Sequence, residues 1–383
     1  MKKFNKILAG VLTAAMLLGL SACGSVSDAT TNKEANQGTE TASDAEGENG
    51  LTKITFCLDW TPNTNHTGLY AAKALGYYEE AGLDVTFVQP PEGGATSMCA
   101  AGQAQFAIDA QDTAAAAWDM DEPLGITAVA AILQHNTSGI MSRKGDGIDS
   151  PKGLEGKTYS TWESPIELAM LDYVMKQDGG DFSKVKQIPN DITDEPAALA
   201  AKQTDAIWVF YGWGGINADV EGVDVDYWAF GDIAPELDYY TPIIVANNDF
   251  LEQNPDTAKA FMEATAKGYE YAIENPKDAA DMLIAGDDTG SLKGCEDLVY
   301  ASQEWISKQY KADASQWGII DADRWNAFYS WLYENKLTTN DLTGKGFTND
   351  YLPAAASTTS ANDAATGSDS DAEYYGYFKG RKY

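Results

Sequence analysis

The stretch ITFCLDWTPNTNHTGLYAAKALG, residues 54–76, joins a short apolar run to a helix-like segment through a loop of polar and aromatic residues. Residues 54–58 are typical of a β-strand, and residues 67–75 are typical of a helix closed by the turn at Gly76. The loop between them follows the carboxyl end of a strand, which is where ligands bind in open α/β sheets. The stretch therefore predicts an α/β fold with a candidate binding loop after its first strand.

Strand-like and helix-like segments continue to alternate beyond this stretch. Strands are expected at 54–58, 84–89, 105–109, 126–133, 158–160, 185–188, 206–211 and 243–246. Helices are expected at 67–75, 93–102, 111–119, 165–176 and 195–202, and within 254–276. This order predicts parallel sheets covered by helices.

Two chain crossings divide the predicted fold into two lobes. The turn-rich segment 144–157 marks entry into a second unit, and the strand at 243–246 is the expected return. We expect lobe 1 to comprise 51–140 and 242–352, and lobe 2 to comprise 141–241. Two crossings make a hinge, with a cleft between the carboxyl ends of the two sheets. Four C-terminal tryptophans are expected in the core and in lobe packing: Trp305, Trp317, Trp325 and Trp331.

The N-terminal segment has the features of a secretory signal peptide, expected over residues 1–22. Lys2, Lys3 and Lys6 precede an apolar run that is too short to span a bilayer, and LSAC ends at Cys23. This end resembles the lipobox of bacterial lipoproteins, which implies acylation of Cys23. An ordinary signal peptide with a chance cysteine is the alternative. We expect a monomer held at the extracytoplasmic face of the cell membrane by this lipid anchor.

Residues near both ends are small and polar. Residues 23–50 are expected to form a disordered tether, and residues 353–383 a low-complexity C-terminal tail whose last ten residues are aromatic and basic. The formal net charge of −32 argues against a nucleic-acid partner.

The cysteines and histidines are few. Beyond Cys23, Cys57, Cys99 and Cys295 cannot pair completely, so buried free thiols are expected, with a Cys57–Cys99 bridge as the alternative. The two histidines are His66, in the candidate loop, and His135, expected at the surface or in a turn. No Cys or carboxylate spacing supports a metal site, so neither a metal nor a cofactor is expected.

Six motifs resemble, in order, one family of proteins. They are DWTPNTNHTGLY (59–70), AKALGYYEEAGLDV (72–85), PPEGGATS (90–97), AAGQAQFAI (100–108), TWESPIELAML (161–171) and AIWVFYGW (206–213). They are similar to the formylaminopyrimidine-binding proteins, which serve ABC importers of thiamine pyrimidine precursors. The resemblance implies a two-lobe type II periplasmic-binding-protein fold. It also implies a small heterocyclic ligand in the cleft, and an ABC permease with its ATPase as partners.

A flat heterocycle offers two faces for aromatic stacking and an edge of nitrogen groups for hydrogen bonds. Trp60, Trp162, Tyr211 and Trp213 are expected to wall the ring, and Asn65, His66 and Glu163 to contact its edge. Tyr70, Asp109 and Ser138 complete the candidate ligand-binding set. Because alternate residues of a strand share a face, Tyr211 and Trp213 are expected to point together, with Trp208 and Phe210 in the core. Asn and Thr residues of the loop can alternatively serve only to build the turn.

Three further features leave alternatives open. Residues 92–97 suit a helix start that binds an anion or one that simply requires small residues. Glu167, one helical turn after Glu163, can be merely solvated. In the family an acidic residue directly follows the tryptophan of AIWVFYGW, whereas this chain has Gly214. Glu163 is one possible substitute for that acid; a different ligand, such as riboflavin or another flat heterocycle, is the other explanation.

The related fungal pyrimidine-precursor synthases carry a cysteine-rich cluster before a strand ending in Ala-Asn. The matching stretch here, LDYYTPIIVAN at 237–247, has Tyr239 and Tyr240 and no cysteine. We therefore expect a binding protein rather than an enzyme.

Overall fold

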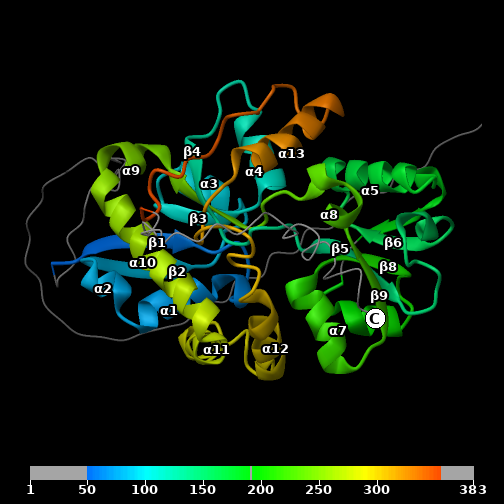
Figure 1. Cartoon of the computed structure of the whole chain (residues 1–383), viewed down its shortest axis with the longest axis horizontal. Helices are drawn as coiled ribbons and strands as arrows, with labels where there is room; N and C mark the ends of the chain where they lie inside the picture. The colour runs from blue at the N-terminus through cyan, green and yellow to red at the C-terminus, as the bar shows by residue number, and fades with distance from the viewer. Residues whose placement is uncertain (1–49, 190–191, 355–383) are drawn as a thin grey trace, which may run out of the picture. The chain divides into compact units, whose positions relative to one another are not determined.

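The computed structural model describes residues 50–189 and 192–354 of the chain (Figure 1). These residues all belong to one compact unit, residues 41–383. The predicted signal peptide, the predicted lipidation site Cys23, most of the predicted tether and nearly all of the predicted C-terminal tail lie outside the described residues. In the described part of the chain, no helix is both long and apolar enough to cross a membrane.

Within residues 50–189 and 192–354, ten strands form two five-stranded sheets. The first sheet has the order β2-β1-β3-β10-β4, with β1 Thr52–Cys57, β2 Leu83–Val88, β3 Phe106–Asp109, β4 Ile126–Ala131 and β10 Ile243–Asn247. The second has the order β7-β6-β8-β5-β9, with β5 Ser138–Arg143, β6 Thr158–Thr161, β7 Lys186–Pro189, β8 Ala206–Phe210 and β9 Val225–Ala229. β5 lies in the second sheet although it starts inside the range expected for lobe 1, and the lobe boundaries remain a prediction.

The expectation of parallel sheets is wrong, because both sheets are mixed. β10 runs antiparallel to β3 and β4, and β5 runs antiparallel to β8 and β9. These two are the first strands that the chain forms after each crossing between sheets. No helical crossover within one sheet precedes them, so nothing requires them to be parallel to their neighbours.

The helices are as follows. Along the first half of the chain they are α1 Thr67–Ala74, α2 Tyr77–Glu80, α3 Ala95–Ala100, α4 Gln111–Trp118, α5 Pro165–Gln177 and α6 Glu195–Ala200. Then follow α7 Ile216–Glu221, α8 Phe230–Ile233, α9 Asn248–Gln253, α10 Pro255–Glu274, α11 Pro276–Gly286, α12 Glu296–Ile306 and α13 Ala322–Glu334. Short 3-10 turns are η1 Thr64–His66, η2 Pro151–Leu154, η3 Phe182–Lys184 and η5 Pro235–Leu237, and η4, Tyr211–Gly215, is a π-helix.

Close packing of α1 on α10 fixes the loop that follows β1. A Cβ atom on Gly268 would lie 2.0 Å from the carbonyl oxygen of Gly68, so only glycine permits this approach. The hydroxyl of Tyr269 then donates a hydrogen bond to the carbonyl oxygen of Asn65, 2.7 Å away. The long helix therefore holds the candidate binding loop in place from behind.

The predicted core residues are buried. Trp305, Trp317, Trp325 and Trp331 are all in the hydrophobic core, which confirms the interpretation of their spacing. Cys57 and Cys99 are buried free thiols, also as expected, and Cys295 is free and partly exposed. Burial raises the pKa of Cys57 to about 11 and also raises that of Cys99.

Candidate functional site

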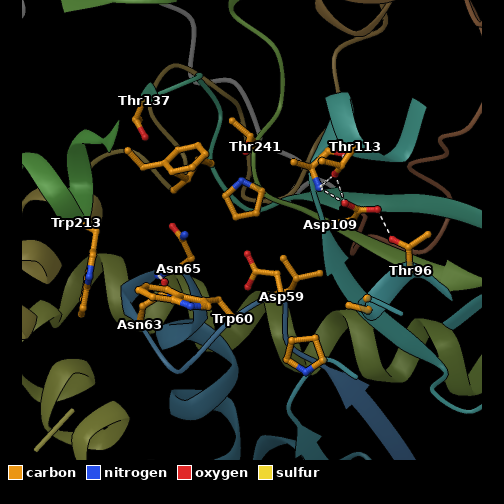
Figure 2. Close-up of a pocket in the computed structure, with 18 of the residues that line it drawn as sticks. Asp59, Trp60, Asn63, Asn65, Thr96, Asp109, Thr113, Thr137, Trp213 and Thr241 are labelled. Carbon is orange, nitrogen blue, oxygen red and sulfur yellow. Dashed lines mark hydrogen bonds between the residues drawn. The ribbon is translucent and has the colours of Figure 1, made fainter. Parts of the chain in front are cut away.

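A cavity of about 720 Å³ lies between the carboxyl ends of strands from both sheets (Figure 2). The first sheet contributes Asp59 and Trp60 after β1 and Asp109 at the end of β3. The second contributes Trp162 after β6 and Phe210 at the end of β8, and the crossing segments add Thr137 and Thr241. This volume is typical of small-molecule sites, and its place agrees with the general position of ligands in α/β sheets.

Indole rings from both sheets border this cavity. Trp60 is 55 % exposed and Trp162 is 52 % exposed, which is unusual for so large an apolar side chain. Trp213 is partly buried, and Figure 2 shows it and Trp60 bordering the same space. These exposed aromatic surfaces can stack against a flat ring.

His66 does not line the cavity but is fully buried beneath it. Its Nδ1 accepts a hydrogen bond from the backbone N–H of Asn63 at 3.2 Å, and its Nε2 lies 2.8 Å from Oδ1 of Asp59. Because a backbone N–H can only donate, Nδ1 is the acceptor and Nε2 carries the proton given to Asp59. His66 thus orients Asp59, whose carboxylate lines the cavity.

Asp109 is held by several donors from its own surroundings. It accepts hydrogen bonds from the hydroxyls of Thr96 and Thr113 and, at 2.7 Å, from the backbone N–H of Ala110 (Figure 2). Burial raises the pKa of Asp109, the three hydrogen bonds oppose this shift, and the nearby carboxylate of Asp59 adds to it. The start of α3 also borders the cavity, where the Thr96 hydroxyl is already engaged by Asp109.

Glu167 is not merely solvated, which was one alternative from the sequence, but supports the backbone at Trp162. Its buried carboxylate accepts hydrogen bonds from the hydroxyl of Tyr159 at 2.6 Å and from that of Thr161 at 3.0 Å. The backbone N–H groups of Trp162 and Ser164 donate to it at 3.2 Å each, which completes a capping box at the start of α5. The capping sequence Ser-x-x-Glu was the available signal for this role.

Glu163, which was expected to contact the ligand, is not among the residues that line the cavity. It is exposed and has a left-handed backbone conformation, with φ of 61°. A role for it in binding remains a prediction that this geometry does not support.

The end of β8 differs from the expected alternation, because the strand stops at Phe210 and residues 211–215 form a π-helix. Tyr211 is therefore buried, with its ring centroid 5.0 Å from that of Tyr227 and 5.2 Å from that of Trp305. Phe210, expected in the core, is 40 % exposed and lines the cavity. Trp208 is buried as expected and also reaches the cavity wall. Single π-helical turns are frequent at functional sites.

Three other residues of interest lie away from the cavity wall. Tyr70 is buried and borders a separate pocket, and Ser138 is buried at the start of β5. His135 is buried rather than superficial, because Nδ1 lies 2.7 Å from Asp238 and Nε2 lies 3.1 Å from Asp313. The contact with Asp238 ties the first crossing segment to the second, and the contact with Asp313 ties it to the segment after α12.

The charge on the wall is entirely acidic. Among the described residues that line the cavity, Asp59, Asp109 and Glu195 are ionisable and none is Lys, Arg or His. Asp59 and Glu195 were missed from the sequence. Asp59 lies beside Trp60 in the first motif and could have been identified there, whereas no local pattern singles out Glu195.

Across the described ranges, no group of three or more His, Cys, Asp or Glu side chains is placed to hold a metal ion.

Comparison with known proteins gives a consistent result. A family model described as "NMT1/THI5 like" matches residues 63–279. A formylaminopyrimidine-binding protein of Halalkalibacterium halodurans is 29 % identical over 302 residues, covering 77 % of this chain and 88 % of that protein. A 4-amino-5-hydroxymethyl-2-methylpyrimidine phosphate synthase of Saccharomyces cerevisiae is 27 % identical over 238 residues, covering 58 % of this chain and 68 % of that protein.

Solved structures show the same architecture. The periplasmic nitrate-binding protein NrtA of Synechocystis PCC 6803 aligns with a TM-score of 0.60 at 13 % sequence identity, covering 79 % of this chain and 87 % of that chain. At this identity the likeness concerns the fold alone. It confirms the predicted two-lobe periplasmic-binding-protein fold.

Proposed function

Because the chain belongs to the NMT1/THI5-like family, we propose that it is the solute-binding protein of an ABC importer. Its ligand is a thiamine pyrimidine precursor of the formylaminopyrimidine or hydroxymethylpyrimidine type. The family match, the formylaminopyrimidine-binding relative and the binding-protein fold support this assignment.

The observation that carries the proposal is the composition of the cavity wall. Exposed indoles from both sheets suit a flat aromatic ring, and a wall with three carboxylates suits a ligand that donates hydrogen bonds. An anion would find no cationic side chain among the described lining residues. A neutral aminopyrimidine, rather than an anion such as nitrate, therefore fits this wall.

In this proposal some residues of the cavity contact the faces of the pyrimidine ring and others contact its edge. Trp60, Trp162 and Trp213 contact the faces of the pyrimidine ring, and the amide of Asn65 and the carboxylate of Asp59 contact its edge. His66 does not contact the ligand directly but orients Asp59 through its hydrogen bond. Tyr70, Ser138 and Tyr211 support the fold around the cavity.

Transport requires that the ligand favour a closed form of the protein. The crossing segments, 132–137 and 238–242, run between the two sheets and border or adjoin the cavity, so bending there changes its width. A ligand shifts this equilibrium only by binding the closed form more tightly than the open one. We propose that the closed, liganded form is recognised by an ABC permease driven by its ATPase.

We propose binding rather than catalysis. The stretch that matches the cysteine-rich cluster of the fungal synthases is buried here, with Tyr239 and Tyr240 in the core and no cysteine. The histidine of the first motif is enclosed and engaged on both ring nitrogens, which suits a positioning role.

The proposed location is the extracytoplasmic face of the cell membrane, through a lipid on Cys23. The lipobox-like sequence LSAC and the binding-protein relatives support it. Labelling of growing cells with a radioactive fatty acid tests it: the label should enter the wild-type protein and not Cys23→Ser.

Isothermal titration calorimetry tests the ligand. The protein is unfolded and refolded to remove carried ligand, then titrated with formylaminopyrimidine, hydroxymethylpyrimidine, thiamine and riboflavin. We expect a micromolar or tighter dissociation constant, about −8 kcal/mol or better, for one of the two pyrimidine precursors. The cavity of about 720 Å³ is spacious for one ring, so riboflavin is the second candidate. Heat from riboflavin alone would select it, and heat from none of the four would contradict both.

A further inference from the structure

Glu195 brings a carboxylate to the cavity from the second sheet. It is the first residue of α6, it is partly buried, and it lines the cavity together with Gly214. A Cβ atom built on Gly214 would lie 3.8 Å from the carboxyl carbon of Glu195 and 3.0 Å from the Cβ of Val209. The absence of a side chain at Gly214 therefore leaves the space beside Trp213 to the carboxylate of Glu195.

The three carboxylates of the cavity differ in how they are engaged. Asp59 accepts from His66, and Asp109 accepts from two hydroxyls and a backbone N–H. Among the described residues, no side chain is found that donates a hydrogen bond or an ion pair to Glu195. Of the three carboxylates, Glu195 therefore keeps the most acceptor capacity for a ligand.

The electrostatic surroundings of Glu195 agree with this difference. Burial raises the pKa of Glu195, its own backbone N–H opposes the shift, and the carboxylates of Asp194 and Glu221 add to the increase. A partly buried carboxylate without a side-chain donor is costly, and a ligand N–H that reaches it recovers much of that cost.

We propose that Glu195 is a specificity-determining residue of the ligand site, which accepts a hydrogen bond from an exocyclic amino group on the heterocycle. The proposal rests on the proposed function and adds to it the chemical group that the second sheet recognises. With the ring against the indole of Trp213, its amino edge meets the carboxylate that occupies the space beside Gly214. A ligand with hydrogen or a carbonyl at that ring position lacks the donor and loses this contact.

The test is a pair of ligands titrated into a set of variants by calorimetry. The ligands are formylaminopyrimidine and its analogue with hydrogen in place of the exocyclic ring amino group. The variants are Glu195→Gln, Glu195→Asp and, as the matched control, Glu221→Gln. Glu221 is exposed and does not line the cavity, so its substitution removes the same charge nearby without changing a group that lines the site.

We expect Glu195→Gln to bind formylaminopyrimidine about 10- to 100-fold more weakly than the wild-type protein, the range for a hydrogen bond to a charged group. Its affinity for the amino-free analogue should change by less than about threefold, because that contact is already missing. Glu195→Asp should fall between the two, since it keeps the charge but shortens the reach. Thermal unfolding of each variant separates a binding effect from a loss of fold.

The possible failures are distinguishable. If the wild-type protein binds formylaminopyrimidine and Glu195→Gln binds it equally well, Glu195 has no such role and the proposed function stands. If Glu195→Gln weakens both ligands by the same factor, the residue does not recognise the amino group, and the proposal is overturned. If the wild-type protein binds neither pyrimidine, the proposed function fails, and this proposal fails with it.

Discussion

The tryptophans of this protein fall into two groups that differ in what covers them. Trp317 and Trp325 are covered by other parts of the chain, and each indole N–H donates to a backbone carbonyl, of Ile132 at 3.2 Å and of Lys345 at 2.9 Å. Trp60 and Trp162 project from loops at the carboxyl ends of strands and leave about half of their surface bare. Covered indoles stabilise the fold. The exposed surface of an indole on a cavity wall is instead buried only when a ligand binds, so its burial contributes to the free energy of binding.

The largest expected difference between the two groups of tryptophans is in the stability of the variant Trp325→Ala. Trp325 is fully buried, and its ring packs near Trp118, Tyr329 and Phe347. Removing it leaves a large void, so we expect the free energy of unfolding to fall by about 3–5 kcal/mol. Urea denaturation followed by circular dichroism measures the change. The matched variant Trp60→Ala should lose less than about 1 kcal/mol, since half of that side chain already contacts solvent; equal losses would mean that the two groups do not differ.

The support beneath a cavity tryptophan is tested by Glu167→Ala. Four donors lose their acceptor, two of them hydroxyls and two of them backbone N–H groups next to Trp162. We expect a loss of about 3 kcal/mol in the free energy of unfolding, because buried donors are left without a partner. Glu163→Ala is the control, four residues away and exposed, and should change stability by less than about 0.5 kcal/mol. A wild-type denaturation curve for Glu167→Ala would show that this carboxylate supports nothing.

The carboxyl of Asp112, which is partly exposed, interacts with the buried rings of Tyr239 and Tyr329, and its titration can be followed. The pKa of Asp112 is raised from 3.8 to about 6, mainly by burial and then by the carboxylate of Asp109. Because the folded protein holds this proton more tightly than the unfolded chain, Asp112 adds stability below about pH 4 that is lost as the pH rises through about 6. Relative to Asp112→Asn, the wild-type free energy of unfolding should therefore fall by about 2–3 kcal/mol from pH 4 to pH 7. Urea denaturation at unit pH steps measures this, and a difference that stays constant with pH would contradict it.

The two groups of tryptophans were also unequally accessible to prediction. The spacing of Trp305, Trp317, Trp325 and Trp331 between helical residues was sufficient to place them in the core. The position of Trp60 directly after the first strand was sufficient to place it at the carboxyl edge of a sheet, where the cavity lies. In both cases a local pattern of period and order determines the position.

Features that depend on distant contacts were not predictable in this way. The family resemblance, with the ability of a neutral imidazole to donate and accept hydrogen bonds, predicts His66 at the ligand, but tertiary packing buries it behind Asp59. The alternation at Tyr211 failed because a π-helical turn replaces the end of the strand. Glu195 approaches Gly214 from another element, and no sequence pattern encodes a proximity between α6 and the segment after β8. Strand β5 is not predicted for a related reason, since the buried strand SGIMSR has no alternating face to detect.

The smallest expected effect concerns the affinity of Trp60→Ala for the ligand rather than the stability of the fold. Trp60→Ala removes an exposed indole that lines the cavity, so we expect the affinity for the pyrimidine ligand to fall by about 2 kcal/mol, or roughly 30-fold. Calorimetric titration measures it, and Tyr333→Ala is the control, because Tyr333 is a similarly exposed aromatic residue, 47 % bare, that does not line the cavity. Saturating ligand should also protect part of the wild-type tryptophan fluorescence from quenching by acrylamide, and this protected fraction should shrink in Trp60→Ala. If the substitution leaves both the ligand affinity and the protection from quenching unchanged, the exposed surface of Trp60 does not contact the ligand. The distinction between buried tryptophans and exposed, ligand-binding tryptophans then does not apply to this residue.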